Sequence, residues 1–390
     1  MLNFNFYNPT RILFGKGQIA ELSSLVPAHS KVLITYGGGS VVRNGILDSV
    51  KKELSQSDRT VLEFGGIEAN PKFETLMKAV EIARSESVDF LLAVGGGSVM
   101  DGTKFIALAA GSDEFKGEEE KILFFGFGPV PVSSALPLGT VVTLPATGSE
   151  MNSGGVVTRG EDKLPVMSPL TFPKFSILDP ELTYTLPATQ VANGVVDTFI
   201  HVVEQYMTFP AEGRFQDRTA EGILQTLLEI GNKTVDNPND YEARANLVWC
   251  ATMALNGLIG AGVPQDWSIH MIGHEMTALF GIDHAKTLAV VTPAMWRVRR
   301  EQKREKLLQY AERVWQITSG SDDEIIDQAI SKTEGFFHSL GIKTRLSDHG
   351  IDAAGIDRII GGLEKHGMTA LSEHGDVTLD VSRQVLETAK

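Results

Sequence analysis

The sequence is poor in cysteine and has no long apolar run. Cys250 is the only cysteine among 390 residues, so no disulfide framework is possible, and its apolar helical surroundings at 247–255 predict a small buried hydrophobe. No apolar stretch approaches the roughly 20 residues of a membrane span. The first residues lack the basic and apolar regions of a secretory signal. We therefore expect a cytoplasmic protein that does not enter a membrane.

Positive charge is also scarce. The chain carries 49 Asp and Glu against 35 Lys and Arg, which gives a formal net charge of -14. Nucleic acids and anionic membranes would be repelled, so the expected partners are small molecules. The composition, 42% hydrophobic and 22% charged, is that of an ordinary globular protein. A length of 390 residues exceeds what one core usually holds and predicts two domains.

Short β-rich runs alternate with helical patterns in residues 10–110. The expected strands are residues 11–14, 31–36, 60–64 and 89–94. The expected helices between them are residues 18–26, 41–55 and 71–85. This alternation predicts an α/β domain with a mostly parallel, Rossmann-like sheet covered by helices on both faces. Such sheets bind ligands at the carboxyl ends of their strands.

The composition changes near residue 187. Before it, residues 111–137 suggest a surface excursion, residues 140–144 resume the sheet, and the further strands expected are 154–159 and 175–178. After it, the β-rich runs stop and helical periodicity continues to the end. We therefore expect an α/β domain at 1–186 and an all-helical domain at 187–390. A cleft between them would bring the glycine-rich turns of the first domain to the polar residues of the second.

Two glycine-rich turns each follow an expected strand and precede a helix, at residues 37–40 (GGGS) and 95–101 (GGGSVMD). Glycine lets the backbone approach a phosphate, whose charge free amides and a helix N-terminus stabilise. Two such turns favour a nucleotide, although glycine turns are common in α/β folds. Neither matches the dinucleotide fingerprint, and Thr103 stands where a phosphate-binding loop needs Lys. Residues 143–150 add hydroxyls and amides, or form an ordinary loop.

Asp197 and His201 are four residues apart in a helical pattern, so both side chains lie on one face. His270 and His274 repeat this spacing, and a break at Gly281 would return His284 toward the same point. One carboxylate and three imidazoles suit zinc or ferrous iron. The alternative is a set of structural helix residues. Glu275 follows the second histidine, not the first, which argues against the metalloprotease helix.

These motifs, in this order, resemble the iron-containing (group III) alcohol dehydrogenase family. The matching stretches are residues 95–101, 144–150, Asp197-x3-His201 and His270-x3-His274-x9-His284, and together they span essentially the whole chain. The segments 35–40, 190–197 and 262–267 are similar to the butanol-dehydrogenase-like branch. The resemblance implies a dinucleotide-binding domain, an all-helical domain, one catalytic divalent ion between them, and a homodimer.

The resemblance also implies residue roles. Asp197, His201, His270 and His284 fall on the metal ligands, and His274 falls on a non-ligand histidine near the nicotinamide. Positions that match the pyrophosphate turn or line the cofactor are Gly96, Gly97, Ser98, Asp101, Asn70, Thr143, Leu144, Ser149 and Lys163. His274, or a water or ribose hydroxyl that it touches, is the candidate proton donor.

Cofactor choice is expected to depend on the turn at 37–40. Gly38, Gly39 and Ser40 offer amides and a hydroxyl to an anion, and the turn lacks the carboxylate that would bind the ribose 2′-hydroxyl of NAD. NADP(H) is therefore expected, with reduction of short and medium-chain aldehydes to alcohols as the working direction. Two rivals remain: a metal-dependent lyase or synthase on the same scaffold, as in dehydroquinate synthase, and a non-catalytic nucleotide-binding protein.

Overall fold

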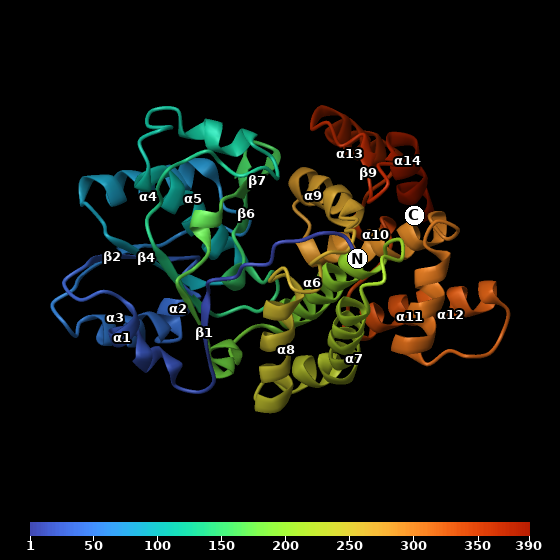
Figure 1. Cartoon of the computed structure of the whole chain (residues 1–390), viewed down its shortest axis with the longest axis horizontal. Coiled ribbons are helices and arrows are strands. Elements are labelled where there is room, and N and C mark those ends of the chain that lie inside the picture. Colours follow the sequence, from blue (N-terminus) through green and yellow to red (C-terminus); the bar gives the residue numbers. More distant parts are fainter. The chain divides into compact units, whose positions relative to one another are not determined.

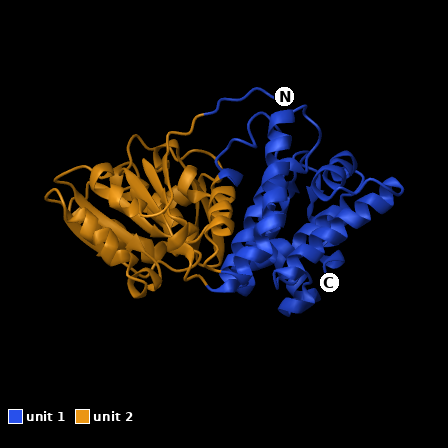
Figure 2. Ribbon diagram, turned by 90° about the horizontal axis from the view of Figure 1, so that it is seen from below, with its two compact units in different colours: residues 1–6, 187–237, 253–390 blue, residues 7–186, 238–252 orange.

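The chain forms two compact units, and the structure, a computed structural model, describes all residues from 1 to 390. Figure 2 shows a helical unit in blue and an α/β unit in orange. The helical unit comprises Met1–Phe6, Pro187–Asn237 and Met253–Lys390. The α/β unit comprises Tyr7–Leu186 and Pro238–Thr252. One border, at Pro187, coincides with the change of composition. Residues 1–6 and 238–252 are exceptions to a single division of the chain, because each belongs to the unit formed by the other part of the sequence.

Polar contacts contribute to both exceptions. The backbone N–H of Leu2 donates to the carbonyl of Gly262 at 2.8 Å, which ties the first residues to the helical unit. Helix α8 (Tyr241–Ala254) is held in the α/β unit through Arg244, whose buried guanidinium donates to the carbonyl of Thr183 at 2.6 Å. These contacts join positions far apart in sequence, and composition carries no signal for them.

Six parallel strands form the sheet of the α/β unit, in the order β1-β8-β5-β4-β2-β3. Figure 1 labels β1, β2 and β4 of this sheet. The strands are β1 (Arg11–Phe14), β2 (Lys31–Tyr36), β3 (Thr60–Phe64), β4 (Phe90–Gly95), β5 (Leu138–Val142) and β8 (Phe175–Leu178). The main helices of this unit besides α8 are α1 (Leu22–Leu25), α2 (Ser40–Arg43), α3 (Ile46–Leu54), α4 (Phe73–Ser85) and α5 (Gly97–Gly111). Alternate side chains of β2 point to opposite faces of the sheet and enter two hydrophobic cores. Leu33 packs in one core with residues of α4 and α5, whereas Val32 and Ile34 pack in the other with residues of α3. The expected parallel sheet with helices on both faces is confirmed.

Three local expectations need correction. Residues 111–137 are not only a surface excursion, because the short helix Glu119–Phe124 buries Ile122 and Leu123 in the core. The strand β6 (Gly154–Arg159) lies outside the main sheet and pairs antiparallel with β7 (Asp162–Met167), which was not expected. The helix expected at 41–55 is interrupted at Gly45, whose φ of 72° is left-handed.

The helical unit contains α6 (Ala188–Tyr206), α7 (Arg214–Asp236), α9 (Ser268–Phe280), α10 (His284–Val298), α11 (Arg304–Trp315), α12 (Asp322–Ser339), α13 (Ala353–Lys365) and α14 (Leu379–Thr388). Helix α6 packs against α7 and α10 and is buried from Val191 to Tyr206. The expectation of helices alone fails at one place, where β9 (Ala370–Leu371) pairs antiparallel with β10 (Val377–Thr378). Helix α6 is therefore a central element of this unit.

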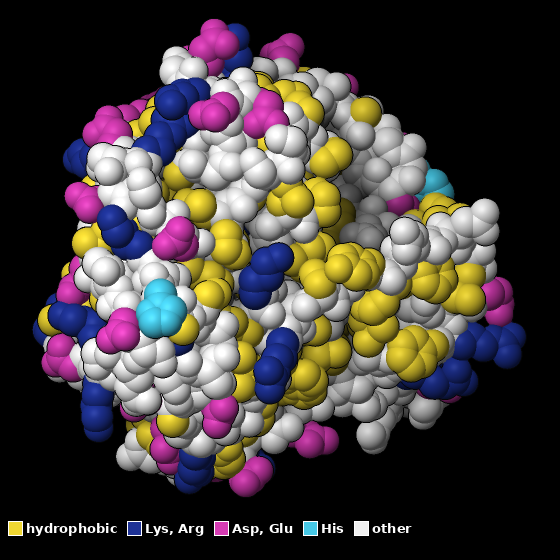
Figure 3. Space-filling view, turned by 60° about the vertical axis from the view of Figure 1, so that its left-hand side comes forward, with side chains coloured by type: hydrophobic (Ala, Val, Ile, Leu, Met, Phe, Trp, Pro, Cys, Tyr) yellow, Lys and Arg dark blue, Asp and Glu magenta, His cyan; other side chains and the backbone are white.

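On the face drawn in Figure 3, Lys and Arg side chains are interspersed with Asp and Glu side chains and form no continuous basic area. None of the helices combines the length and the apolar character needed to span a membrane. Cys250 lies buried on α8, as expected, and burial raises the pKa of its thiol to about 12.

Candidate metal centre

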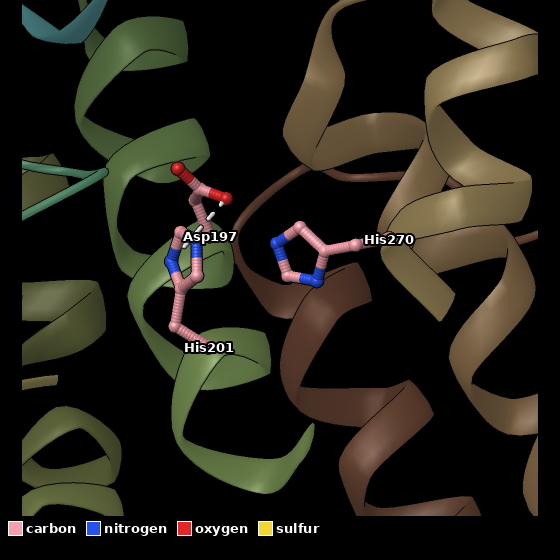
Figure 4. A group of neighbouring side chains, drawn as sticks. All are labelled: Asp197, His201 and His270. Atoms are coloured by element: carbon pink, nitrogen blue, oxygen red, sulfur yellow. Dashed lines mark ion pairs between the residues drawn. The ribbon is translucent and has the colours of Figure 1, made fainter. Parts of the chain in front are cut away.

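Two elements of the helical unit direct a carboxylate and two imidazoles into one small volume (Figure 4). Asp197 and His201 project from successive turns of α6, and His270 projects from α9. One potential ligand atom from each of the three lies within 4.8 Å of the others. The Nδ1 atom of His201 is 3.7 Å from Oδ1 of Asp197. The expected spacing of four residues thus produces a convergent pair.

His284 reaches the same place because the chain turns after α9. Gly281 ends this helix with a left-handed φ of 67°, as the sequence suggested, and α10 begins at His284. Its Nε2 atom is 3.8 Å from Oδ1 of Asp197, and its ring centroid is 5.2 Å from that of His270. His284 is therefore adjacent to the group of three formed by Asp197, His201 and His270.

His274 lies one turn beyond His270 on α9 and stays outside that group of three. Its ring centroid is 5.0 Å from that of His284 and 6.1 Å from that of His270. This position places an imidazole beside the candidate metal ligands. It is consistent with the proton-transfer role expected for His274.

The burial of these groups fits a cation. Oδ1 of Asp197 and Nδ1 of His201 are buried and make no hydrogen bond, an arrangement that costs roughly 1–3 kcal/mol per group unless something offsets it. Burial, the largest effect, lowers the pKa of His201 to about 4, although the carboxylate of Asp197 acts in the opposite direction. At neutral pH His201 is therefore uncharged, the form that coordinates metals. One carboxylate with imidazoles suits zinc or iron.

Two residues beside the cluster were missed by the sequence analysis. Glu204 lies on α6 beyond His201, and its carboxylate contacts Nδ1 of His270. Burial raises the pKa of Glu204. Trp267, just before α9, has a left-handed φ of 65°, and its ring centroid is 5.2 Å from that of His270 and 6.2 Å from that of His201. A non-glycine residue in this conformation is strained, which is frequent beside functional sites.

The two glycine-rich turns leave the same edge of the sheet side by side. Strands β2 and β4 are parallel neighbours, with Tyr36 opposite Val94, and the turns follow directly. Gly39 has a φ of 90° at the start of α2. At Gly97 an added Cβ would lie 2.5 Å from the side chain of Thr147, so this position requires glycine. The sequence-based placement of both turns is consistent with a shared ligand.

The structure brings several of the expected cofactor residues together. Ser98 accepts a hydrogen bond from the backbone of Asn70 at 3.2 Å. An added Cβ on Gly96 would lie 3.0 Å from Cβ of Leu144. Residue Thr143 continues from β5 and donates its N–H to the carbonyl of Gly95 at 2.9 Å. Gly38 and Ser40 flank Gly39, whereas Lys163 lies on β7 opposite Thr158.

A buried lysine stabilises the segment behind the second turn. Lys104 donates to Ser149 Oγ at 2.8 Å, to Asn152 Oδ1 at 2.9 Å and to the carbonyl of Gly154 at 2.6 Å. Ser149 in turn donates to Asp101 at 2.7 Å. Burial lowers the pKa of Lys104 to about 8 and raises that of Asp101. Asp101 and Ser149 thus connect α5 to the segment after β5, and Lys104 was missed as the centre of this network.

The chain matches one known protein family over most of its length. Residues 9–180 match the iron-containing alcohol dehydrogenase family, and residues 191–370 match the C-terminal region of the Fe-containing alcohol dehydrogenase family. The NADPH-dependent aldehyde reductase YqhD of Escherichia coli is 57% identical over 100% of both chains. A solved structure of E. coli YqhD has a TM-score of 0.97 and 57% identity, covering 100% of this chain and 99% of that one.

A second solved relative is more distant. The NADH-dependent butanol dehydrogenase A of Thermotoga maritima is 34% identical, with a TM-score of 0.92 and coverage of 100% of this chain and 99% of that chain. The fold is therefore that of a two-domain dehydrogenase with an α/β part and a helical part. The chain belongs to the iron-containing alcohol dehydrogenase family.

We predict that Asp197→Ala and His270→Ala lose bound metal while the fold survives, because each removes a candidate ligand from a helix that is held by apolar packing. Elemental analysis of dialysed protein, with circular dichroism for the fold, measures both effects. His338→Ala is the matched control, because His338 belongs to the same unit and bonds to Thr344 at 2.8 Å. One equivalent of zinc or iron in a variant lacking Asp197, His201, His270 and His284 would contradict the assignment.

Proposed function

We propose that this protein is an NADPH-dependent and metal-dependent aldehyde reductase that converts short and medium-chain aldehydes to primary alcohols. The observation that carries the proposal is the convergence of Asp197, His201 and His270, with His284 beside them, in a chain of this family. The full-length identity to an NADPH-dependent aldehyde reductase supports the cofactor and the substrate class. Asp197, His201, His270 and His284 are the proposed metal ligands.

The metal ion and NADPH would supply the chemistry of the reaction, and the chain would position them. When bound, a zinc or ferrous ion supplies a Lewis acid for the aldehyde oxygen, and NADPH supplies the hydride. The chain's own residues orient these groups and keep water from buried polar atoms. Asp197, His201, His270 and His284 would hold a divalent ion with one carboxylate and three neutral imidazoles, a ligand set that would leave the ion with net positive charge for its Lewis-acid role.

Cofactor binding is assigned to the α/β unit. Gly96 is the N-cap of α5, a helix of fifteen residues, and Gly97, Ser98 and Asp101 lie in its first two turns. A helix N-terminus favours a pyrophosphate. The further residues proposed to line the cofactor are Asn70, Thr143, Leu144, Ser149 and Lys163. The turn with Gly38, Gly39 and Ser40 has no carboxylate, so it offers only neutral groups to a 2′-phosphate. This turn is the proposed basis of the NADPH preference.

One assay tests the function and separates it from its main rival. NADPH oxidation is measured with a panel of aldehydes before chelation, after chelation and after zinc or iron is restored. We expect aldehyde-dependent oxidation that disappears on chelation and returns with one of the two metals. If no aldehyde gives net NADPH oxidation, the assignment as a reductase is wrong and a metal-dependent lyase or synthase is favoured. Activity that survives complete metal removal would contradict the metal dependence.

The proposal includes a cytoplasmic homodimer. The family resemblance supports the dimer, and the exposed apolar side chains of Leu2, Phe4 and Phe6 are consistent with a surface that a second copy covers. The single reduced cysteine fits the cytoplasm. Light scattering tests the dimer, since a mass near 42.3 kDa would indicate a monomer. Cell fractionation tests the compartment.

We predict that His274→Ala keeps its metal but lowers turnover by about 10², the usual scale for a general acid. The reason is that His274 lies next to His284 without belonging to the group of three candidate ligands. Turnover is measured with NADPH and its deuterated form, so that the isotope effect shows whether hydride transfer limits the rate. Unchanged turnover under that condition would make His274 a structural residue.

We predict that Gly38→Asp costs most of the NADPH preference. The ratio of kcat/KM for NADPH to that for NADH should fall by about 10², or roughly 2–3 kcal/mol, because the carboxylate repels the 2′-phosphate. Gly38 suits the test because an added Cβ meets no atom within 4 Å, whereas Gly39 has a left-handed φ of 90°. Gly38→Asn is the uncharged control. A native enzyme with equal or better kcat/KM for NADH would show that the turn was misread.

A further inference from the structure

A buried glutamate occupies the same face of α6 as two of the proposed metal ligands. Glu204 follows His201 by three residues and Asp197 by seven, so the three lie along one helical stripe. Its side chain is 1% exposed. Glu204 is not one of the residues whose ligand atoms converge. Its carboxylate instead faces the first turn of α9.

Three contacts hold this carboxylate against His270. Oε1 accepts the backbone N–H of Ile269 at 2.7 Å, and Oε2 accepts the backbone N–H of His270 at 3.2 Å. Oε2 also contacts Nδ1 of the His270 ring. The backbone bonds fix the position of the carboxylate, and the ring contact transmits that position to the imidazole. Glu204 therefore contacts both the backbone N–H and the imidazole ring of the candidate ligand His270.

We propose that Glu204 is the positioning residue of the metal centre, which holds His270 in the tautomer that presents Nε2 to the metal. A neutral imidazole carries one proton, and a carboxylate at Nδ1 requires that proton on Nδ1. The lone pair then lies on Nε2. Hydrogen bonding of this kind raises the basicity of a ligating histidine and fixes its ring. The inference rests on the metal-dependent function proposed above.

Charge balance supports the same role. Asp197 is the only carboxylate among the proposed ligands, so a divalent ion there retains one positive charge. The backbone N–H groups of Ile269 and His270 favour the ionised form of Glu204 against the burial that raises its pKa. In that form Glu204 adds a second negative charge one imidazole away, and its only ion-pair partner is His270. The buried lysine Lys303 forms its ion pairs with other carboxylates, since its Nζ lies 2.7 Å from Asp266 and 3.5 Å from Glu373. A buried carboxylate without a cation is costly, and a metal ion one imidazole away offsets that cost.

Helix capping alone does not explain Glu204. Asp266 satisfies only the first amide of α9, since its Oδ1 accepts the N–H of Ser268 at 3.0 Å, so Glu204 also caps this helix through the amides of Ile269 and His270. A cap would not require contact with a side-chain nitrogen of His270. Glu204 makes this contact in addition to its two backbone bonds. The two roles are distinguishable, because a cap affects stability whereas a positioning residue affects metal affinity.

The test compares Glu204→Gln with native protein by titrating the metal-free chains with Zn²⁺ and Fe²⁺ against a chromophoric chelator. We expect Glu204→Gln to bind either ion about 10- to 100-fold more weakly, the usual effect of losing such a partner. The matched control is Glu334→Gln, in the same unit and also buried, which bonds to Arg297 at 2.6 Å and to Thr344 at 2.9 Å. This control should change the melting temperature but not the metal affinity. Glu204→Asp, which keeps the charge, should bind more tightly than Glu204→Gln.

Affinity of Glu204→Gln within twofold of native would overturn the inference and leave the proposed function intact. A native chain that binds neither ion would overturn both. If Glu204→Gln does not fold, nitrogen NMR of histidine-labelled native protein without metal decides the question. We expect the His270 signals to show a protonated Nδ1 and an unprotonated Nε2, and the opposite tautomer would overturn the inference.

Discussion

The buried polar stripe of α6 is the constraint on which the helical unit depends. Asp197, His201 and Glu204 lie on a helix that is buried along most of its length. Burying a carboxylate and an imidazole without hydrogen bonds costs several kcal/mol, roughly 1–3 kcal/mol for each unsatisfied group. A fold keeps such groups when a bound cation or a catalytic role compensates. The apolar packing of α6 against α7 and α10 therefore provides the rigidity that a metal centre needs.

The α/β unit solves a different problem, because it must hold flexible glycine turns in one conformation. Gly96 and Gly97 have no side chains with which to fix themselves, so neighbouring residues supply the restraint. Leu144 and Thr147 leave no space for a Cβ, and Lys104 joins Ser149 to the segment that follows. A turn restrained in this way would bind an anion with less entropic cost than a loop that must first be ordered.

Local patterns predicted those features of the fold that depend on local residues. The strands of the parallel sheet, the pairing of Asp197 with His201 and the turn at Gly281 all follow from spacings of four residues or fewer and from glycine conformation. Strand β7 was missed because its polar residues carry no alternating pattern, and it pairs only with β6. Glu204 could not be linked to His270, because 66 residues separate them. The only sequence signal for Glu204 was its spacing on α6, which places it on the same stripe as Asp197 and His201.

Family membership depends on the whole fold, whereas the choice between NADPH and NADH depends on a few atoms around one phosphate group. The fold requires hundreds of residues to agree, and the family includes relatives named for NADPH and for NADH. Discrimination between these cofactors concerns one phosphate group, and a single carboxylate can change its binding by a few kcal/mol, about 1.4 kcal/mol for each tenfold in affinity. Overall similarity therefore constrains the reaction more strongly than the cofactor. Gly38, in the turn proposed to select the cofactor, has room for a side chain, because an added Cβ there meets no atom within 4 Å.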